Sequence, residues 1–206
     1  MNLGENEAVL NFFSSFNPDS ITTTLLFLLI GSILTMCVQS SAAVMAITMI
    51  LCSSGALPIY QGIALVMGEN IGTTVTSNLA ALTASTQARR AAFAHMFFNV
   101  FGVIWMLFVL HPFIDMVCSI VGYEQGVSDP AMLSVVLAMF HTCFNLINTA
   151  ILIGFVPQIE KIVCWAIKEK KEPEKEGVRL QYIGNGLVQT PEIAVLQAEN
   201  RVMGFK

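Results

Sequence analysis

The stretch ITTTLLFLLIGSILTMCVQSSAAVMAITMILCSS, residues 21–54, decides the fold class of this chain. It is apolar and free of charged residues, and the polar run Gln39-Ser40-Ser41 lies near its middle. A helix that spans a bilayer needs about 20 mostly apolar residues. The stretch is therefore too long for one crossing and too short for two. It predicts two half-length helices that meet at a polar tip, a re-entrant hairpin, with a single long tilted helix as the alternative.

The composition of the whole chain places it among membrane proteins. Of its 206 residues 55% are hydrophobic and only 12% are charged, about half the charged fraction of a soluble domain. No Lys or Arg precedes Arg89 and Arg90, and the remaining basic residues all lie from Lys161 onward. A nucleic-acid-binding protein needs a basic face, which excludes that class. The five widely spaced cysteines form no metal-binding pattern and are expected to be small buried apolar residues.

Three further stretches predict helices that cross the membrane. Residues 58–84 are apolar but contain the polar run Gly68-Glu69-Asn70-Ile71-Gly72-Thr73-Thr74, which predicts a broken helix. Residues 91–110 and residues 131–156 each have the length and composition of an ordinary transmembrane helix. We therefore expect an all-α integral membrane domain over residues 21–166, with a re-entrant hairpin, one broken transmembrane helix and two further transmembrane helices.

The basic residues predict how this domain is oriented. Short loops rich in Lys and Arg stay in the cytoplasm, and two crossings separate Arg89 and Arg90 from the cluster at residues 161–175. Both basic groups then lie on the same, cytoplasmic side, whereas the loop over residues 115–129 carries acids and no base. We expect a multi-pass protein of the plasma (inner) membrane with a cytoplasmic C-terminal tail.

The regions that flank the membrane domain differ from it in composition. Residues 1–20 form an N-terminal extension that lacks the basic region of a signal peptide. Residues 167–177 alternate in charge and read as a linker, and residues 178–206 are polar and amphipathic. So short an amphipathic segment buries little by itself, so we interpret it as the start of a larger domain.

The two polar runs predict a site for a small solute or ion. Non-helical backbone survives at membrane depth only where protein or a wet cavity surrounds it. Helix N-termini at such breaks attract anions, while carbonyl and hydroxyl oxygens coordinate Na⁺. The candidate ligands are Gln39, Ser40, Ser41, Asn70, Thr73 and Thr74, and Gly68 and Gly72 would permit an unwound turn. The alternative is that these small residues only pack helices together.

Glu69 is the only carboxylate within the second polar run. A carboxylate in an apolar segment is costly and is by default a candidate for function. Glu69 could bind Na⁺, relay a proton or pair with Arg89 or Arg90, and a cation-binding or pairing role is favoured.

A second recurrence is the pattern His-x-x-Phe-Asn, which occurs at His95–Asn99 and again at His141–Asn145. His and Asn four residues apart share one face of a helix. They would either hydrogen-bond to hold helices together or act directly as ligands. Arg89 and Arg90 are interpreted as topology anchors rather than phosphate ligands.

Taken together, four motifs resemble the sodium/phosphate cotransporter family, the type II class and its bacterial relatives, over about residues 20 to 165. They are, in chain order, Gln39-Ser40-Ser41-Ala42-Ala43, Gly68-Glu69-Asn70-Ile71-Gly72-Thr73-Thr74, residues 88–99 and residues 140–149. The resemblance implies two inverted repeats, each with a Gln-Ser-Ser hairpin and a broken helix around phosphate and sodium. It makes Gln39, Ser40 and Ser41 candidates for binding phosphate and sodium, beside Asn70, Thr73 and Thr74.

The chain departs from that family pattern at two points. The third serine of the hairpin motif is Ala42 here, and only one copy of each motif is present. The chain therefore resembles the second repeat alone, and residues 177–206 resemble the opening of the PhoU-like helical domain of bacterial members. One half of an inverted-repeat transporter is the implied architecture.

The predicted function is sodium-coupled transport of inorganic phosphate, with sodium ion, phosphate, the lipid bilayer and a second repeat as partners. No nucleophile–base pair indicates an enzyme, and no cofactor beyond the transported ions is expected. The alternative is a membrane scaffold or regulatory subunit, in which the polar runs only mediate helix packing.

Overall fold

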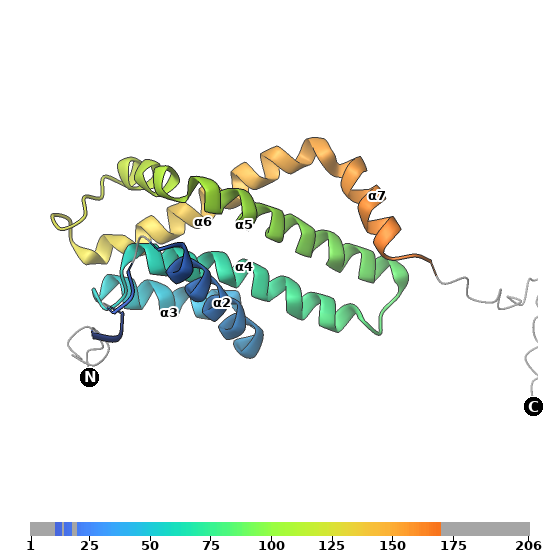
Figure 1. Ribbon diagram of the computed structural model, residues 1–206, viewed down its shortest axis with the longest axis horizontal. Helices are drawn as coiled ribbons and strands as arrows, with labels where there is room; N and C mark the ends of the chain where they lie inside the picture. The colour runs from blue at the N-terminus through green and yellow to red at the C-terminus, as the bar shows by residue number, and fades with distance from the viewer. Residues whose placement is uncertain (1–10, 14, 18–19, 170–206) are drawn as a thin grey trace, which may run out of the picture. The chain divides into compact units, whose positions relative to one another are not determined.

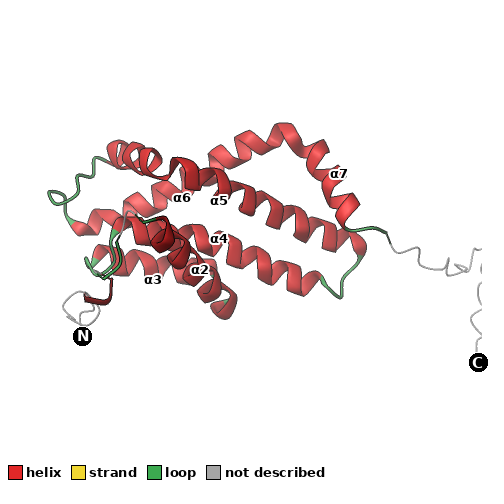
Figure 2. Cartoon of the chain, viewed as in Figure 1, coloured by secondary structure: helices red, strands yellow, loops and turns green. Residues whose placement is uncertain are grey.

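The computed structural model describes residues 11–13, 15–17 and 20–169, and every regular element among them is helical. The chain divides into two units, residues 1–169 and residues 170–206. The predicted C-terminal segment 178–206, most of the predicted linker and most of the N-terminal extension lie outside the described residues. The elements, shown in Figures 1 and 2, are α2 (Ile21–Val38), α3 (Ser41–Ser53), α4 (Ile59–Ala81), α5 (Thr86–Val121), η2 (Pro130–Met132), α6 (Leu133–Leu152), η3 (Ile153–Phe155) and α7 (Val156–Ala166).

Three of the described helical stretches are long and apolar enough to cross a membrane. They are Ile21–Val38, Thr86–Val121 and Pro130–Ala166. Helix α3 is apolar but has only 13 residues, about 20 Å at 1.5 Å per residue, which is less than the hydrocarbon thickness. The all-helical membrane class predicted from the sequence agrees with this architecture.

The predicted break in the first apolar stretch lies where the sequence placed it. Helix α2 ends at Gln39, whose φ of 56° is left-handed and whose backbone N–H donates to Thr35 O at 2.8 Å. Ser40 then has extended backbone, and its side chain accepts from Ala43 N at 3.3 Å, capping the start of α3. The polar tip is therefore a helix end followed directly by a helix start.

The predicted break in the second apolar stretch is wrong, because α4 is one continuous helix from Ile59 to Ala81. Its two glycines serve close packing instead of unwinding. A Cβ atom added to Gly68 would clash with the backbone oxygen of Leu28 on α2, and one added to Gly72 would lie 2.5 Å from Ser32 O. The Ser32 hydroxyl lies 2.9 Å from Gly68 O, across the same contact. The polar run thus permits two helices to meet backbone to backbone.

Prolines explain the two bends in the later helices. Helix α5 is kinked at Val109, which has a φ of −118° and a ψ of 18°, three residues before Pro112. A proline inside a helix removes one backbone hydrogen bond and clashes with the preceding turn. Helix α6 gives way to η3 and then to α7, which has Pro157 in its first turn and turns back toward the start of α5 in Figure 1.

The hydrophobic core lies among α4, α5 and α6. Trp105 of α5 stacks on Phe144 of α6 at 6.0 Å between ring centroids, and Phe140 stacks on Phe144 at 6.1 Å. The expectation that the cysteines are buried is right only for Cys52. Cys37 is exposed and the other three are half-buried, and all five are free thiols. Apolar residues on the lipid-facing side of a membrane helix have no protein neighbour to cover them.

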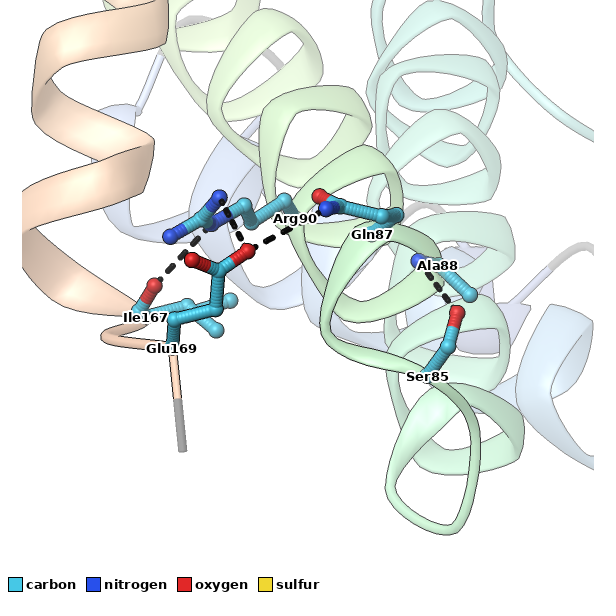
Figure 3. A network of polar contacts seen from close by, with 6 residues as sticks. All are labelled: Ser85, Gln87, Ala88, Arg90, Ile167 and Glu169. Atoms are coloured by element: carbon cyan, nitrogen blue, oxygen red, sulfur yellow. Dashed lines mark hydrogen bonds and ion pairs between the residues drawn. The ribbon is translucent and has the colours of Figure 1, made fainter. Parts of the chain in front are cut away.

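The start of α5 and the end of α7 meet in a polar contact, the Arg90 contact, shown in Figure 3. Arg90 Nε donates to Ile167 O at 3.1 Å, and Arg90 lies 3.9 Å from a carboxylate oxygen of Glu169. Gln87 also donates to that oxygen, at 3.4 Å. The basic residues at the start of α5 and those near the end of α7 therefore lie at the same end of the bundle, as the sequence predicted.

Candidate functional site

Helix α4 packs against α2, α3 and α6 at the level of its polar run. Helix α2 runs parallel to α4, since Gly31 contacts Leu65 and Thr35 contacts Gly72 further along both helices. Helix α3 runs antiparallel to α4, since Cys52 contacts Gly62 and Thr48 contacts Glu69.

Glu69 is deeply buried, with 3% of its surface exposed. Its Oε1 lies 3.3 Å from the hydroxyl of Thr48 on α3, and that hydroxyl also lies 3.0 Å from Val44 O. Among the described residues Glu69 makes no ion pair, and Arg90 is engaged by Glu169. Of the roles left open for Glu69, an ion pair with Arg89 or Arg90 is therefore not formed among the described residues.

Asn70 faces α6 rather than α3, because successive residues of a helix point about 100° apart. Its Oδ1 lies 3.3 Å from Nε2 of His141. Its Nδ2 is buried and has no hydrogen-bond partner. Buried polar atoms in proteins are nearly always hydrogen-bonded, so this unpaired amide is a candidate donor to a further group.

Thr73 and Thr74 turn their hydroxyl groups onto their own helix. Thr73 donates to Glu69 O at 2.9 Å and Thr74 donates to Ile71 O at 2.7 Å. Both hydroxyl groups therefore have a hydrogen-bond acceptor within α4 itself, without a break in the helix. The hydroxyl oxygens retain lone pairs that can accept a bond or coordinate a cation.

The polar tip between α2 and α3 is more exposed than the polar run of α4. Gln39 is exposed, and Ser40 and Ser41 are half-buried. Within residues 20–169 no hydrogen bond joins these three residues to Asn70, Thr73 or Thr74. The two predicted halves of the site are instead neighbours through Thr35, which lies against Gly72 and is one turn before Gln39.

The first His-x-x-Phe-Asn motif does not join helices, and the second does so only through His141. Asn99 donates to His95 O at 3.0 Å, and Asn145 donates to His141 O at 2.8 Å, so each asparagine bonds within its own helix. His95 is exposed, whereas His141 is half-buried against Asn70. Only the second motif therefore contributes a side chain to the cluster around α4.

Three polar residues that the sequence did not single out are important in the structure. Thr35 has a buried hydroxyl without a partner, and Thr48 contacts Glu69. Asn148 is fully buried, donates to Phe98 O at 3.0 Å and accepts from Trp105 Nε1 at 3.1 Å, which joins α6 to α5. Thr35 could have been found from its place on the helix that leads to Gln39.

We refer to Thr35, Thr48, Glu69, Asn70 and His141 as the central polar cluster. It draws side chains from α2, α3, α4 and α6 onto the middle of α4. The described part of the chain contains no group of three His, Cys, Asp or Glu residues that could hold a metal ion. The cluster instead offers neutral oxygens and one carboxyl group, the kind of environment that suits Na⁺.

A small cavity of about 130 Å³ lies at the N-terminal end of α4. It is lined by Ile59, Tyr60, Ile114, Asp115, Cys118, Tyr123 and Gln125. None of the predicted site residues contributes to it. Burial and the charge of nearby groups raise the pKa of the Tyr123 phenol above its usual value.

Comparison with known sequences assigns the chain to a family. The family model described as Na⁺/Pi-cotransporter matches residues 7–122, which include both polar runs and more than half of the chain. The chain belongs to the Na⁺/Pi-cotransporter family. Membership accounts for the order of the motifs along α2, α3 and α4.

The relatives of this cotransporter-family chain come from bacteria and animals. YqeW, an uncharacterized protein of Bacillus subtilis (strain 168), is 37% identical over 130 residues, 63% of this chain and 38% of YqeW. The human sodium-dependent phosphate transport protein 2B is 32% identical over 141 residues, 63% of this chain and 20% of that protein. YjbB of Escherichia coli (strain K12), whose name provisionally gives it inorganic phosphate export, is 25% identical over 179 residues.

The match to YjbB covers 87% of this chain and 31% of YjbB, so the chain spans well under half the length of each of these relatives. No solved structure matches the chain significantly.

Proposed function

We propose that this chain forms one half of a sodium-coupled transporter of inorganic phosphate, with its α5-start and α7-end side in the cytoplasm. The observation that carries the proposal is the central polar cluster, in which buried Asn70 Nδ2 and Thr35 Oγ1 lack partners. Family membership and relatives named for phosphate transport support it. An unpaired donor and an unpaired hydroxyl beside a carboxyl group are suited to a small hydrated ion.

The two polar regions would bind different ions. The oxygens of Asn70, Thr73, Thr74 and Glu69 are suited to Na⁺, which prefers hard oxygen ligands. Gln39, Ser40 and Ser41 are suited to phosphate, because α3 starts there and the backbone N–H groups of a helix start favour an anion. The hydroxyl groups of Ser40 and Ser41 would add hydrogen bonds to the phosphate oxygens.

In this proposal a second repeat completes the site, and the exposure of the tip supports it. Transporter sites formed near the membrane midplane lie at the interface of two repeats. An exposed Gln39 facing lipid would be costly, because unsatisfied polar groups at membrane depth cost several kcal/mol each. A re-entrant arrangement of α2 and α3 against an inverted second repeat would cover the tip with protein.

Transport measured in proteoliposomes tests the proposed function. The chain would be reconstituted alone and as a fusion with a first repeat from a relative, and labelled phosphate would be followed with a sodium gradient in either direction. We expect sodium-dependent phosphate movement from the fusion and little from the chain alone. Equal rates with sodium and with choline in the fusion would contradict the proposal. The direction of net movement distinguishes uptake from export.

A scaffold or regulatory subunit is the second candidate, and the close packing of α2 on α4 favours it. Gly68 and Gly72 are used for helix contact, and Thr73 and Thr74 bond to their own helix. These are features of residues that only pack helices. Phosphate that binds neither the chain nor the fusion, together with capture of a membrane partner, would support this reading.

A further inference from the structure

Helix α7 extends the chain beyond the length that one membrane crossing needs. The helical stretch Pro130–Ala166 has 37 residues, about 55 Å if it were straight, whereas the hydrocarbon core of a bilayer is about 30 Å thick. Helix α6 alone, with 20 residues, is about 30 Å long. The stretch bends directly after α6, because Phe155 has a φ of −108° and a ψ of 9° and Pro157 lies in the first turn of α7. Helix α7 therefore begins where a crossing by α6 ends, and it turns toward the start of α5 in Figure 1.

Exposed charges keep α7 out of the hydrocarbon core. Glu160 and Lys161, in the middle of α7, are both exposed, and neither makes an ion pair among the described residues. A charged side chain at the centre of a bilayer is costly unless it has a partner or faces a wet cavity. Just beyond α7, Lys168 is exposed, and Ile167 O accepts from Arg90 at the start of α5. Helix α7 therefore lies at or outside the headgroup level, at the end of the bundle that holds the Arg90 contact.

One side of α7 is too apolar to face water. Phe155, Ile162 and Trp165 are 52%, 40% and 77% exposed. Ile162 follows Phe155 by seven residues and Trp165 follows Ile162 by three, so the three side chains lie on one side of the helix, the α7 apolar side. Val163 is buried and points about 200° away from Trp165, and α7 packs against α5. The α7 apolar side is thus separate from the face that is buried in the bundle.

Unpaired basic residues border the α7 apolar side. Lys161 precedes the exposed tryptophan by one helical turn and so shares its side of the helix. Arg89 and Lys168 are at the same end of the bundle, and among the described residues none of these three bases makes an ion pair. Glu169 is engaged by Arg90, which leaves Glu160 as the unpaired acid of this region. Tryptophan and bases on an amphipathic helix are typical of the membrane interface, where the bases meet anionic headgroups.

We propose that α7 is an interfacial helix that binds anionic phospholipid. The α7 apolar side enters the boundary between headgroups and acyl chains, and the anionic headgroups are bound by Arg89, Lys161 and Lys168. Placing α7 in water would leave its apolar side uncovered, and placing it in hydrocarbon would strand its exposed charges, whereas the interface accommodates both. The inference does not rest on the proposed function, because it uses no residue of the central polar cluster.

The two tryptophans of the chain allow a direct test by fluorescence. The whole chain would be reconstituted in phosphatidylcholine bilayers that contain a fixed fraction of brominated phosphatidylglycerol or brominated phosphatidylcholine, since bromine quenches a tryptophan that it contacts. The signal of Trp165 is the difference between the wild type and Trp165→Phe, which leaves Trp105 and its bond to Asn148 intact. At low salt we expect phosphatidylglycerol to quench this signal about two- to fivefold more effectively, with a smaller preference at high salt.

Other surroundings of α7 give different results. Quenching of Trp165 by aqueous iodide and not by brominated lipid would place α7 in water. Quenching by neither would mean that protein, such as a second copy of this chain, covers the α7 apolar side. Either result would overturn the proposal.

Lysine variants test the role of charge. We expect Lys161→Gln to reduce the preference for phosphatidylglycerol, its combination with Lys168→Gln to reduce it further, and the matched control Lys161→Arg to retain it. Equal quenching by the two lipids in the wild type, or a preference unchanged in the double lysine variant, would overturn the assignment of anionic lipid to these bases. Failure of phosphate transport would alter none of these results, so the two proposals fail separately.

Discussion

The two polar runs of this chain are alike in composition and opposite in structure. Gln39-Ser40-Ser41 ends one helix and starts the next, and it is left largely uncovered. Residues 68–74 stay helical and are enclosed by α2, α3 and α6. The difference lies in the local packing and backbone conformation of each run. The second run has a parallel helix pressed on its glycines, whereas the first has a left-handed Gln39 and a serine that caps the following helix.

The close packing of α2 on α4 predicts the largest effect on stability. Gly68→Ala places a Cβ atom against the backbone of Leu28, which cannot move like a side chain. We expect a loss of about 3 kcal/mol or more in unfolding free energy, at or beyond the upper end of overpacking effects. Thermal unfolding in detergent would measure it. Gly154→Ala is the control, because nothing lies within 4 Å of a Cβ there, and equal destabilisation by both variants would refute backbone contact as the cause.

The next largest effect on stability is expected at Asn148, which joins two helices, in contrast to Asn145, which does not. Asn148→Ala removes two hydrogen bonds between α5 and α6 and opens space in the core, whereas Asn145→Ala removes one bond within α6. We expect a loss of about 1–2 kcal/mol for Asn148→Ala and well under 1 kcal/mol for Asn145→Ala. Unfolding in denaturant would compare them. A reversed order would mean that the buried bonds of Asn148 do not hold the helices together.

The open tip predicts a loss of function without a loss of stability. Glycine adopts left-handed backbone readily, so Gln39→Gly preserves the turn at φ 56° and removes the side chain with its amide. Because glycine fits this left-handed position but adds freedom to the unfolded chain, we expect the unfolding free energy to stay within about 1 kcal/mol of the wild type, and sodium-dependent phosphate movement in the fusion to fall at least severalfold. Wild-type transport in this variant would remove Gln39 from the site.

The Arg90 contact predicts the smallest effect. Arg90 is partly exposed and Glu169 is largely exposed, with a separation of 3.9 Å. Exposed ion pairs contribute about 0.2–1 kcal/mol. We expect Arg90→Ala to lower the unfolding free energy by less than about 1 kcal/mol, with a dependence on salt, while Arg89→Ala has less effect because Arg89 makes no ion pair among the described residues. Equal effects, insensitive to salt, would contradict a role for the ion pair.

The features that the sequence predicted correctly depend on composition along the chain. Apolar length gave the helical membrane class, the polar tip gave the end of α2, and the basic residues gave the shared end of α5 and α7. The continuity of α4 could not be predicted in this way. A glycine that unwinds a helix and a glycine that lets a second helix approach look the same until the neighbour is known.

The same limit explains the missed and misread polar residues. Thr48 and Asn148 are single polar residues in apolar helices, and only the packing of α3 on α4 and of α6 on α5 reveals their partners. The His-x-x-Phe-Asn pattern was noticed because it repeats, yet both asparagines bond to their own helix. Repetition in sequence identified a shared helix face and not a shared contact.

Protection of cysteines by ligand tests most directly whether the tip and the middle of α4 belong to one site. Ser40→Cys and Thr73→Cys would each be placed in the fusion with a first repeat, in a background without the native cysteines, and labelled with a thiol reagent. We predict that Na⁺ and phosphate together slow the labelling of both positions, and that a cysteine at Gln125, at the other end of the bundle, is unaffected. Protection at neither position, or at only one of them, would contradict a single site shared by the two polar runs.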